Sequence, residues 1–124
     1  MERTKYFTPG GSCPVRDVLG RLGDKWTVLV LLVLDENQLM RFVDIHRAIP
    51  DISPRMLTVT LRTLEADGII GRRVYAEVPP RVEYRLTDRG RSLVPHVLAL
   101  VEWAQANMEG ILEDRQARSG SPSA

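Results

Sequence analysis

A helix placed directly before a β-hairpin is the feature that most constrains the fold of this chain. Ser53-Pro54 is a typical helix start, with serine as the cap and proline in the first turn. Gly68 supplies a left-handed stop to this helix. Two β-type runs follow at residues 69–75 and 81–86, and the short sequence AEVPP joins them into a hairpin with a stiff tip.

Apolar residues at helical spacing predict further helices around this unit. The first begins near Cys13. The second covers residues 25–34 behind an Asp24 cap and is apolar nearly all round, as expected of a central buried helix. A brief extended stretch leads into a short third helix at 42–49, and the last helix covers about 88–112. This order predicts a mainly α fold with a small β-hairpin (α+β), a winged helix-turn-helix domain with helical additions at both ends.

The length and composition fit one domain. The chain has 124 residues, of which 44% are hydrophobic, enough for a core of ordinary size. We expect the domain at residues 13–112, a flexible arm at 1–12 and a disordered tail at 113–124. The longest apolar run, 28–34, is far too short to cross a bilayer, and the first residues lack the apolar stretch of a secretory signal. The sequence therefore predicts a cytoplasmic protein without a membrane partner.

Several classes of chemistry lack their sequence signatures. One cysteine, Cys13, excludes an intrachain disulfide framework, and two distant histidines beside it form no zinc pattern. We expect both histidines to be surface or hydrogen-bonded residues. There is no nucleophile elbow, no phosphate-binding glycine loop and no pair of catalytic carboxylates. We therefore expect neither a cofactor nor an enzymatic activity.

Charge is distributed unevenly along the chain, although the net charge is only +1. Residues 53–91 hold eight arginines against five acidic residues, whereas residues 102–114 hold four acidic residues and no basic one. Arginine suits phosphates and guanine edges, so the basic segment is a candidate face for a polyanion. A solvated surface of mixed charge would give the same pattern, and charge by itself leaves both interpretations open.

Longer stretches of the sequence resemble a known family. CPVRDVLGRLGDKWTVLVL, followed by RFVDIHRAIPDISPRMLTVTLRTLEADGIIGRRVYAEVPPRVEYRLTDRGRSL, resembles the HxlR family of bacterial transcription regulators, relatives of the MarR group. The resemblance covers about Cys13 to Trp103. It implies a homodimeric winged helix protein that binds operator DNA, and several members use the cysteine before the proline as a redox or electrophile sensor. The chain departs from the family at Val59, often a polar residue there, and in the turn ENQLM, which lacks the usual glycine.

Helix geometry separates two faces on the helix after Ser53. Three leucines fall on one face, and the opposite face carries arginine, hydroxyl and small apolar groups, a mixture that suits a major groove. The candidate DNA-binding residues of this helix are Ser53, Pro54, Arg55, Thr58, Val59 and Arg62. In the hairpin, which would be the wing, Arg81 is the first candidate contact, with Arg73 and Arg85 second. Alternatively, these strand arginines pair with Glu77 or Glu83.

The last helix has more apolar residues than one small domain can cover, which favours a homodimer. Two-fold dimers read half-sites roughly 10 bp apart, so the expected partners are a pseudo-palindromic double-stranded operator and a second copy of the chain. The alternative is that these helices only close the core of the monomer, where we also expect both tryptophans, Trp26 and Trp103. The candidate interface residues are Val15, Val18 and Leu19 in the first helix and Val97, Leu100, Val101, Ala104, Met108 and Ile111 in the last.

Cys13 is a candidate redox-sensing residue. It stands at a helix N-terminus with Arg16 one turn on, and both features favour the reactive thiolate. A buried thiol that only packs is the alternative. A regulator could instead respond to a small-molecule effector, which no residue identifies, and a winged helix could also serve protein–protein contact rather than DNA. A sequence-specific, DNA-binding transcriptional regulator is the interpretation that accounts for most of these features.

Overall fold

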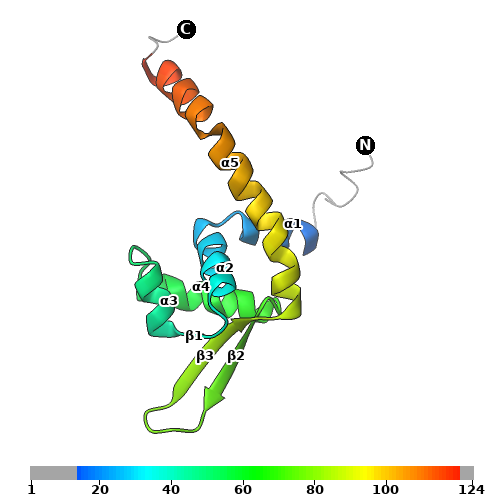
Figure 1. The fold of residues 1–124 in the computed structure, drawn as a ribbon, viewed down its shortest axis with the longest axis vertical. Coiled ribbons are helices and arrows are strands. Elements are labelled where there is room, and N and C mark those ends of the chain that lie inside the picture. The colour runs from blue at the N-terminus through cyan, green and yellow to red at the C-terminus, as the bar shows by residue number, and fades with distance from the viewer. Residues whose placement is uncertain (1–13, 121–124) are drawn as a thin grey trace. The chain divides into compact units, whose positions relative to one another are not determined.

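The computed structural model describes residues 14–120 and has a winged helix-turn-helix fold (Figure 1). The chain divides into two compact units, with the boundary between Ser92 and Leu93. The first unit holds four helices, a three-stranded sheet and the start of the last helix, which provides the second unit. In chain order the elements are α1 (Pro14–Leu22), α2 (Lys25–Glu36), β1 (Met40–Arg41), α3 (Phe42–Ala48), α4 (Pro54–Ala66), β2 (Ile70–Tyr75), β3 (Arg81–Leu86) and α5 (Asp88–Gly120).

The expected starts of α2 and α4 and the expected stop after α4 are confirmed. Asp24 caps α2, since its Oδ1 accepts a hydrogen bond from the Trp26 backbone N–H at 3.0 Å. Ser53 caps α4 in the same way, because its Oγ accepts from the Met56 N–H at 3.0 Å, with Pro54 in the first turn. Gly68 follows α4 with a φ of +71°, the left-handed conformation that glycine adopts without steric cost.

The core of the first unit forms around α2, as its apolar sequence predicts. Val30 and Leu31 are fully buried, and Ile45 of α3 is fully buried as well. In α4, the side chains at the expected core positions are at most 2% exposed: Leu57, Leu61 and Leu64. Periodicity therefore assigned the inner face of α4 correctly, and the opposite face is the one left to solvent.

The sheet is antiparallel, with β3 in the middle between β1 and β2. Ile70 pairs with Leu86 at the base of the β2–β3 hairpin, and both side chains are buried. The short strand β1 adds Met40 opposite Tyr84. Beyond this base the hairpin projects away from the helices as the wing (Figure 1).

The start of α5 is joined closely to the end of α4. The Thr87 hydroxyl lies 2.6 Å from the Gly68 carbonyl oxygen and accepts a hydrogen bond from the Gly90 N–H at 3.1 Å. Gly90 itself packs against backbone: a Cβ added there would lie 2.2 Å from the carbonyl oxygen of Ile69. Only glycine fits at this position without movement of the chain.

The predicted end of the last helix is wrong. We expected it near Leu112, with residues 113–124 as a disordered tail, but α5 continues to Gly120. The added segment consists largely of glutamate, arginine, glutamine and alanine, which favour helix. Arg118 also lies in the last turn, where a cation interacts favourably with the helix dipole. Among residues 14–120, no helix combines the length and hydropathy needed to cross a bilayer.

Candidate nucleic-acid interface

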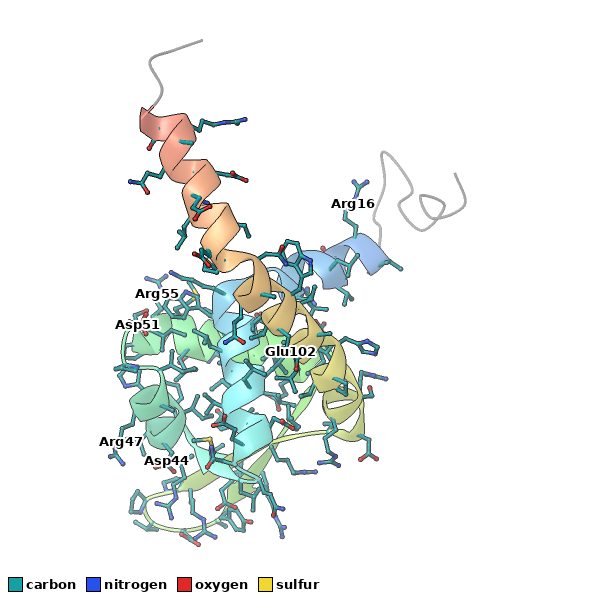
Figure 2. The ribbon with its side chains drawn as sticks, turned by 45° about the horizontal axis from the view of Figure 1, so that its top comes forward. Arg16, Asp44, Arg47, Asp51, Arg55 and Glu102 are labelled. Carbon is teal, nitrogen blue, oxygen red and sulfur yellow. The ribbon has the colours of Figure 1, made fainter. Side chains whose placement is uncertain are left out.

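The outer face of α4 has the composition expected from the sequence. Arg55 and Arg62 are exposed, and Val59 between them is 49% exposed. Neither arginine forms an ion pair with any residue in the range 14–120. Thr58 is half-buried, and its hydroxyl donates to the Pro54 carbonyl oxygen at 2.9 Å. Figure 2 shows Arg55 at the start of the helix, beside the loop that carries Asp51.

The first turn of α4 can bind an anion with a single backbone donor. Pro54 has no N–H, the Met56 N–H is bonded to Ser53 Oγ, and the Leu57 N–H is bonded to the Ser53 carbonyl oxygen. The Arg55 N–H remains, next to the Arg55 guanidinium. Since a helix N-terminus attracts negative charge, this pair of donors can hold one phosphate.

The side of the wing that faces α4 carries Arg72, which the sequence reading missed. Its Nε lies 3.3 Å from Glu65 Oε2 of α4. Arg72 and Arg62 both line a small cavity of about 110 Å³ between α4 and the sheet, together with Tyr84, whose pKa is raised by burial. The signal was present in the sequence, because Arg72 stands two residues after the buried Ile70 and so shares its face of the strand.

Arg81, the first candidate of the wing, is already engaged by acidic residues. Its Nη2 lies 3.4 Å from Glu77 Oε1, its Nε lies 4.0 Å from Glu83 Oε2, and its guanidinium carbon stands 4.0 Å from the centre of the Tyr75 ring. The Nε contact is an ion pair without a hydrogen bond, since 4.0 Å is too long for one. The alternative pairing with Glu77 and Glu83 thus describes Arg81 in the structure.

The two secondary candidates of the wing keep their charges without acidic partners in the part of the chain that the structure describes. Arg73 is exposed, with its guanidinium carbon 4.9 Å from the Tyr75 ring centre. The guanidinium of Arg85 lies over Gly71, 3.4 Å from where a Cβ would stand. Strand pairing places Arg73, Arg81 and Arg85 together on the face opposite Arg72.

The candidate interface residues are exposed or half-buried in the single chain, except for one that is buried. In α1, the three apolar candidates are 41–50% exposed. In α5, Leu100 is 69% and Met108 is 42% exposed, whereas Val101, Ala104 and Ile111 are half-buried. Val97 is only 4% exposed within the single chain. Trp103 is 61% exposed, so the expectation that it packs in the core is wrong, and Trp26 is half-buried beneath the Lys25 ammonium.

Cys13 and His46 are the remaining residues that the sequence singled out. Cys13 lies outside the described residues. His46 is hydrogen-bonded as expected, with Nε2 3.0 Å from the Ile52 carbonyl oxygen. Between residues 14 and 120, no three His, Cys, Asp or Glu side chains gather where they could hold a metal ion.

A match to a protein-family model assigns this chain to a family. The model for HxlR-like helix-turn-helix proteins matches residues 21–111, which include α2 to α4, the wing and most of α5. The chain belongs to the HxlR family. This confirms the resemblance read from the sequence motifs, and with it the winged helix-turn-helix fold.

Relatives of this HxlR-family protein are named as regulators. An uncharacterised HTH-type transcriptional regulator of Methanothermobacter thermautotrophicus is 52% identical over 93 residues, which are 75% of this chain and 70% of the relative. The structure of the regulator ytfH from Salmonella typhimurium is similar with a TM-score of 0.76 and 38% identity, over 85% of this chain and 93% of that one. The structure of the reduced form of the redox regulator HypR is similar with a TM-score of 0.72 and 44% identity, over 82% of this chain and 98% of that one. The protein is therefore a transcriptional regulator with a helix-turn-helix domain.

Proposed function

We propose that this regulator binds a pseudo-palindromic duplex operator as a homodimer, with α4 of each subunit in the major groove. The observation that carries the proposal is the outer face of α4, where two arginines that have no acidic partner among residues 14–120 flank an exposed valine. Guanidinium forks pair with guanine edges or phosphates, and a valine suits the thymine methyl group. Arg55 and Arg62 would provide base readout, and Val59 would read by apolar contact because it has no hydrogen-bonding group.

In this proposal the wing contributes affinity more than sequence preference. Arg73 and Arg85 keep their charge available for the phosphate backbone, and Arg72 extends the basic surface beside Arg62. Arg81 has a different task, since two carboxylates and an aromatic ring already surround it. It holds the two strands of the wing together next to the tip, and its charge reaches DNA partly neutralised.

The operator experiment is selection of bound sequences from a random duplex pool by the full chain. We expect a two-fold symmetric sequence whose half-sites lie roughly 10 bp, or a multiple of it, apart. Binding should fall steeply with salt, because each phosphate contact that is formed releases about 0.9 counterion. Selection of no sequence, together with binding that ignores salt, would favour the protein-interaction module over the DNA regulator.

A charge in the exposed stripe of α5 should weaken the dimer. Leu100 is 69% exposed in one chain, and we assign it to the contact with a second copy. Leu100→Glu would bury a carboxylate in that contact, so the dissociation constant should rise at least about tenfold, or about 1.4 kcal/mol. Sedimentation velocity at a series of concentrations measures the change.

The matched control for this variant is Leu39→Glu. Leu39 is 54% exposed and lies between α2 and β1, outside both helices assigned to the interface. It should leave the dissociation constant unchanged. A wild-type chain that sediments as a monomer at micromolar concentration, or equal behaviour of the two variants, would contradict the assignment.

Cys13 is proposed as the redox-sensing residue, supported by the sequence around it and by the likeness to HypR. With one cysteine in each chain, oxidation can join the Cys13 thiols of two subunits. Diamide would accept the two protons and two electrons as the disulfide forms. We expect diamide to lower operator binding by the wild type but not by Cys13→Ser, as measured by fluorescence anisotropy. The same response in both proteins would remove Cys13 from the mechanism.

A further inference from the structure

A cleft between α1 and α4 has the size of a small-molecule site. Its volume is about 560 Å³, within the range in which drug-sized ligands bind. The cleft is lined by residues of α1, of the start of α2 and of the side of α4 next to its outer face. They are Arg16, Asp17, Gly20, Arg21, Asp24, Thr27, Met56, Val59, Thr60 and Thr63.

Two nearly buried threonines in this cleft lack a hydrogen-bond partner. Thr27 and Thr60 are each only 4% exposed, and neither hydroxyl bonds to any residue in the described range 14–120. Within residues 14–120, Arg81 Nε is the only fully buried side-chain nitrogen or oxygen without a hydrogen-bond partner. The two threonine oxygens are therefore not completely buried. Both residues line the cleft, so a molecule bound there can reach their side chains. Buried polar groups in native proteins are nearly always paired, which makes these two hydroxyls candidate ligand contacts.

The charged groups of the cleft are already engaged within the protein. Arg21 donates a hydrogen bond to Asp67 and lies 3.9 Å from Asp17. The hydrogen bond to Asp67 raises the pKa of Arg21, so this guanidinium stays charged. Asp24 accepts the Trp26 N–H, and Arg16 also has an interaction within the protein. A charged ligand would have to break one of these pairs, whereas an uncharged ligand would leave them intact.

We propose that the α1–α4 cleft binds an uncharged small molecule, with a hydrogen-bonding group at Thr27 and Thr60 and an apolar part against Met56 and Val59. Val59 lines the cleft and is also exposed on the outer face of α4. A ligand there would therefore change operator affinity, a consequence that rests on the proposed function.

Gly20 provides the means to close the cleft. It lines the space, and a Cβ added at this residue meets nothing within 4 Å. A side chain can therefore be added there without displacing backbone, and a long one reaches the space that Gly20 lines. Gly20→Met is thus a variant that fills the site, and Gly110→Met in α5, also without an atom within 4 Å, is its matched control.

Three probes of one size and different charge test the proposal with the full chain. Benzamide is neutral, benzoate is an anion and benzylammonium is a cation. We expect benzamide to bind at least about fivefold more tightly than either ion, with shifts in the backbone amide signals of Gly20, Thr60 and Thr63 in ¹⁵N NMR titrations. Tighter binding of either ion, shifts confined to other residues, or no benzamide binding up to roughly 10 mM would overturn the proposal.

The variants locate the probe. Gly20→Met should weaken benzamide binding at least about tenfold, and Gly110→Met should not change it. Thr60→Val removes one hydroxyl at constant shape and should weaken benzamide binding about fivefold, the effect of one hydrogen bond. This variant tests the site if Gly20→Met fails to fold. Unchanged binding by both cleft variants would overturn the site. Because these titrations contain no DNA, a protein that binds benzamide but no duplex would keep the cleft and lose the proposed function.

Discussion

Replacing Arg62 by alanine should lower the preference for operator over unrelated DNA by about 5- to 150-fold, or about 1–3 kcal/mol, the energy of a bidentate arginine–base contact. The reason is that Arg62 is exposed on the outer face of α4, and no acidic side chain in the described range pairs with it. Anisotropy titrations with the selected operator and with an unrelated duplex of equal length, at the same salt, measure the preference.

Two other arginines serve as controls for Arg62. Arg115→Ala removes an exposed charge from α5, outside the proposed interface, and should change neither affinity. Arg81→Ala should weaken both duplexes by a similar factor, because it loosens the wing and uncovers Glu77 and Glu83 without removing a base contact. Equal losses for both duplexes in the Arg62 variant would show that Arg62 binds phosphate rather than bases.

The outer face of α4 could be predicted from sequence because a helix fixes the direction of each side chain. Once Ser53 and Gly68 mark its ends, three leucines define the buried side, and Arg55, Val59 and Arg62 follow on the other. The capping residues support this prediction, since Ser53 occupies the N-cap position and Gly68 adopts the left-handed conformation after the last turn. Local rules therefore sufficed for the two faces of this helix.

The wing could not be predicted to the same depth, because its contacts depend on the pairing of two strands. All its arginines look alike in the sequence, and only the register places Arg81 opposite Tyr75 and Arg73 opposite Glu83. Distances then decide that Arg81 is the arginine paired with the wing's own carboxylates, Glu77 and Glu83. Arg72 differs from them, because its side of the sheet follows from the alternation with Ile70 within one strand and needs no register.

The end of α5 and Trp103 show two further limits of sequence reading. The polar composition of the segment after Leu112 predicts disorder, although most of its residues favour helix and continue an existing helix without a new nucleation step. The expectation that Trp103 packs in the core also fails, since it is 61% exposed. Large apolar side chains left exposed on a helix, Leu100 and Trp103 together, are better explained by a partner surface than by the core of one chain.

Adding one methyl group at Gly90 should destabilise the fold by about 3 kcal/mol, the upper part of the range for overpacked sites. The Cβ of Gly90→Ala would lie 2.2 Å from the Ile69 carbonyl oxygen. That oxygen cannot move easily, because it accepts a hydrogen bond from the Thr87 N–H at 3.0 Å and shares the Thr87 hydroxyl proton with the Gly68 carbonyl oxygen. Thermal unfolding at fixed protein concentration should therefore show a midpoint lower by about 10 °C or more.

The same substitution at Gly110 should have the opposite sign. Gly110 also lies within α5, but nothing stands within 4 Å of its added Cβ. Gly110→Ala then keeps only the gain in helix propensity, about 0.5–1 kcal/mol, and the midpoint should rise by a few degrees. Because the two variants differ only in what the methyl group meets, an unchanged midpoint for Gly90→Ala would mean that the start of α5 does not pack closely on the Ile69 backbone. The Thr87 hydrogen bonds could then not be what holds the first turn of α5 at the end of α4.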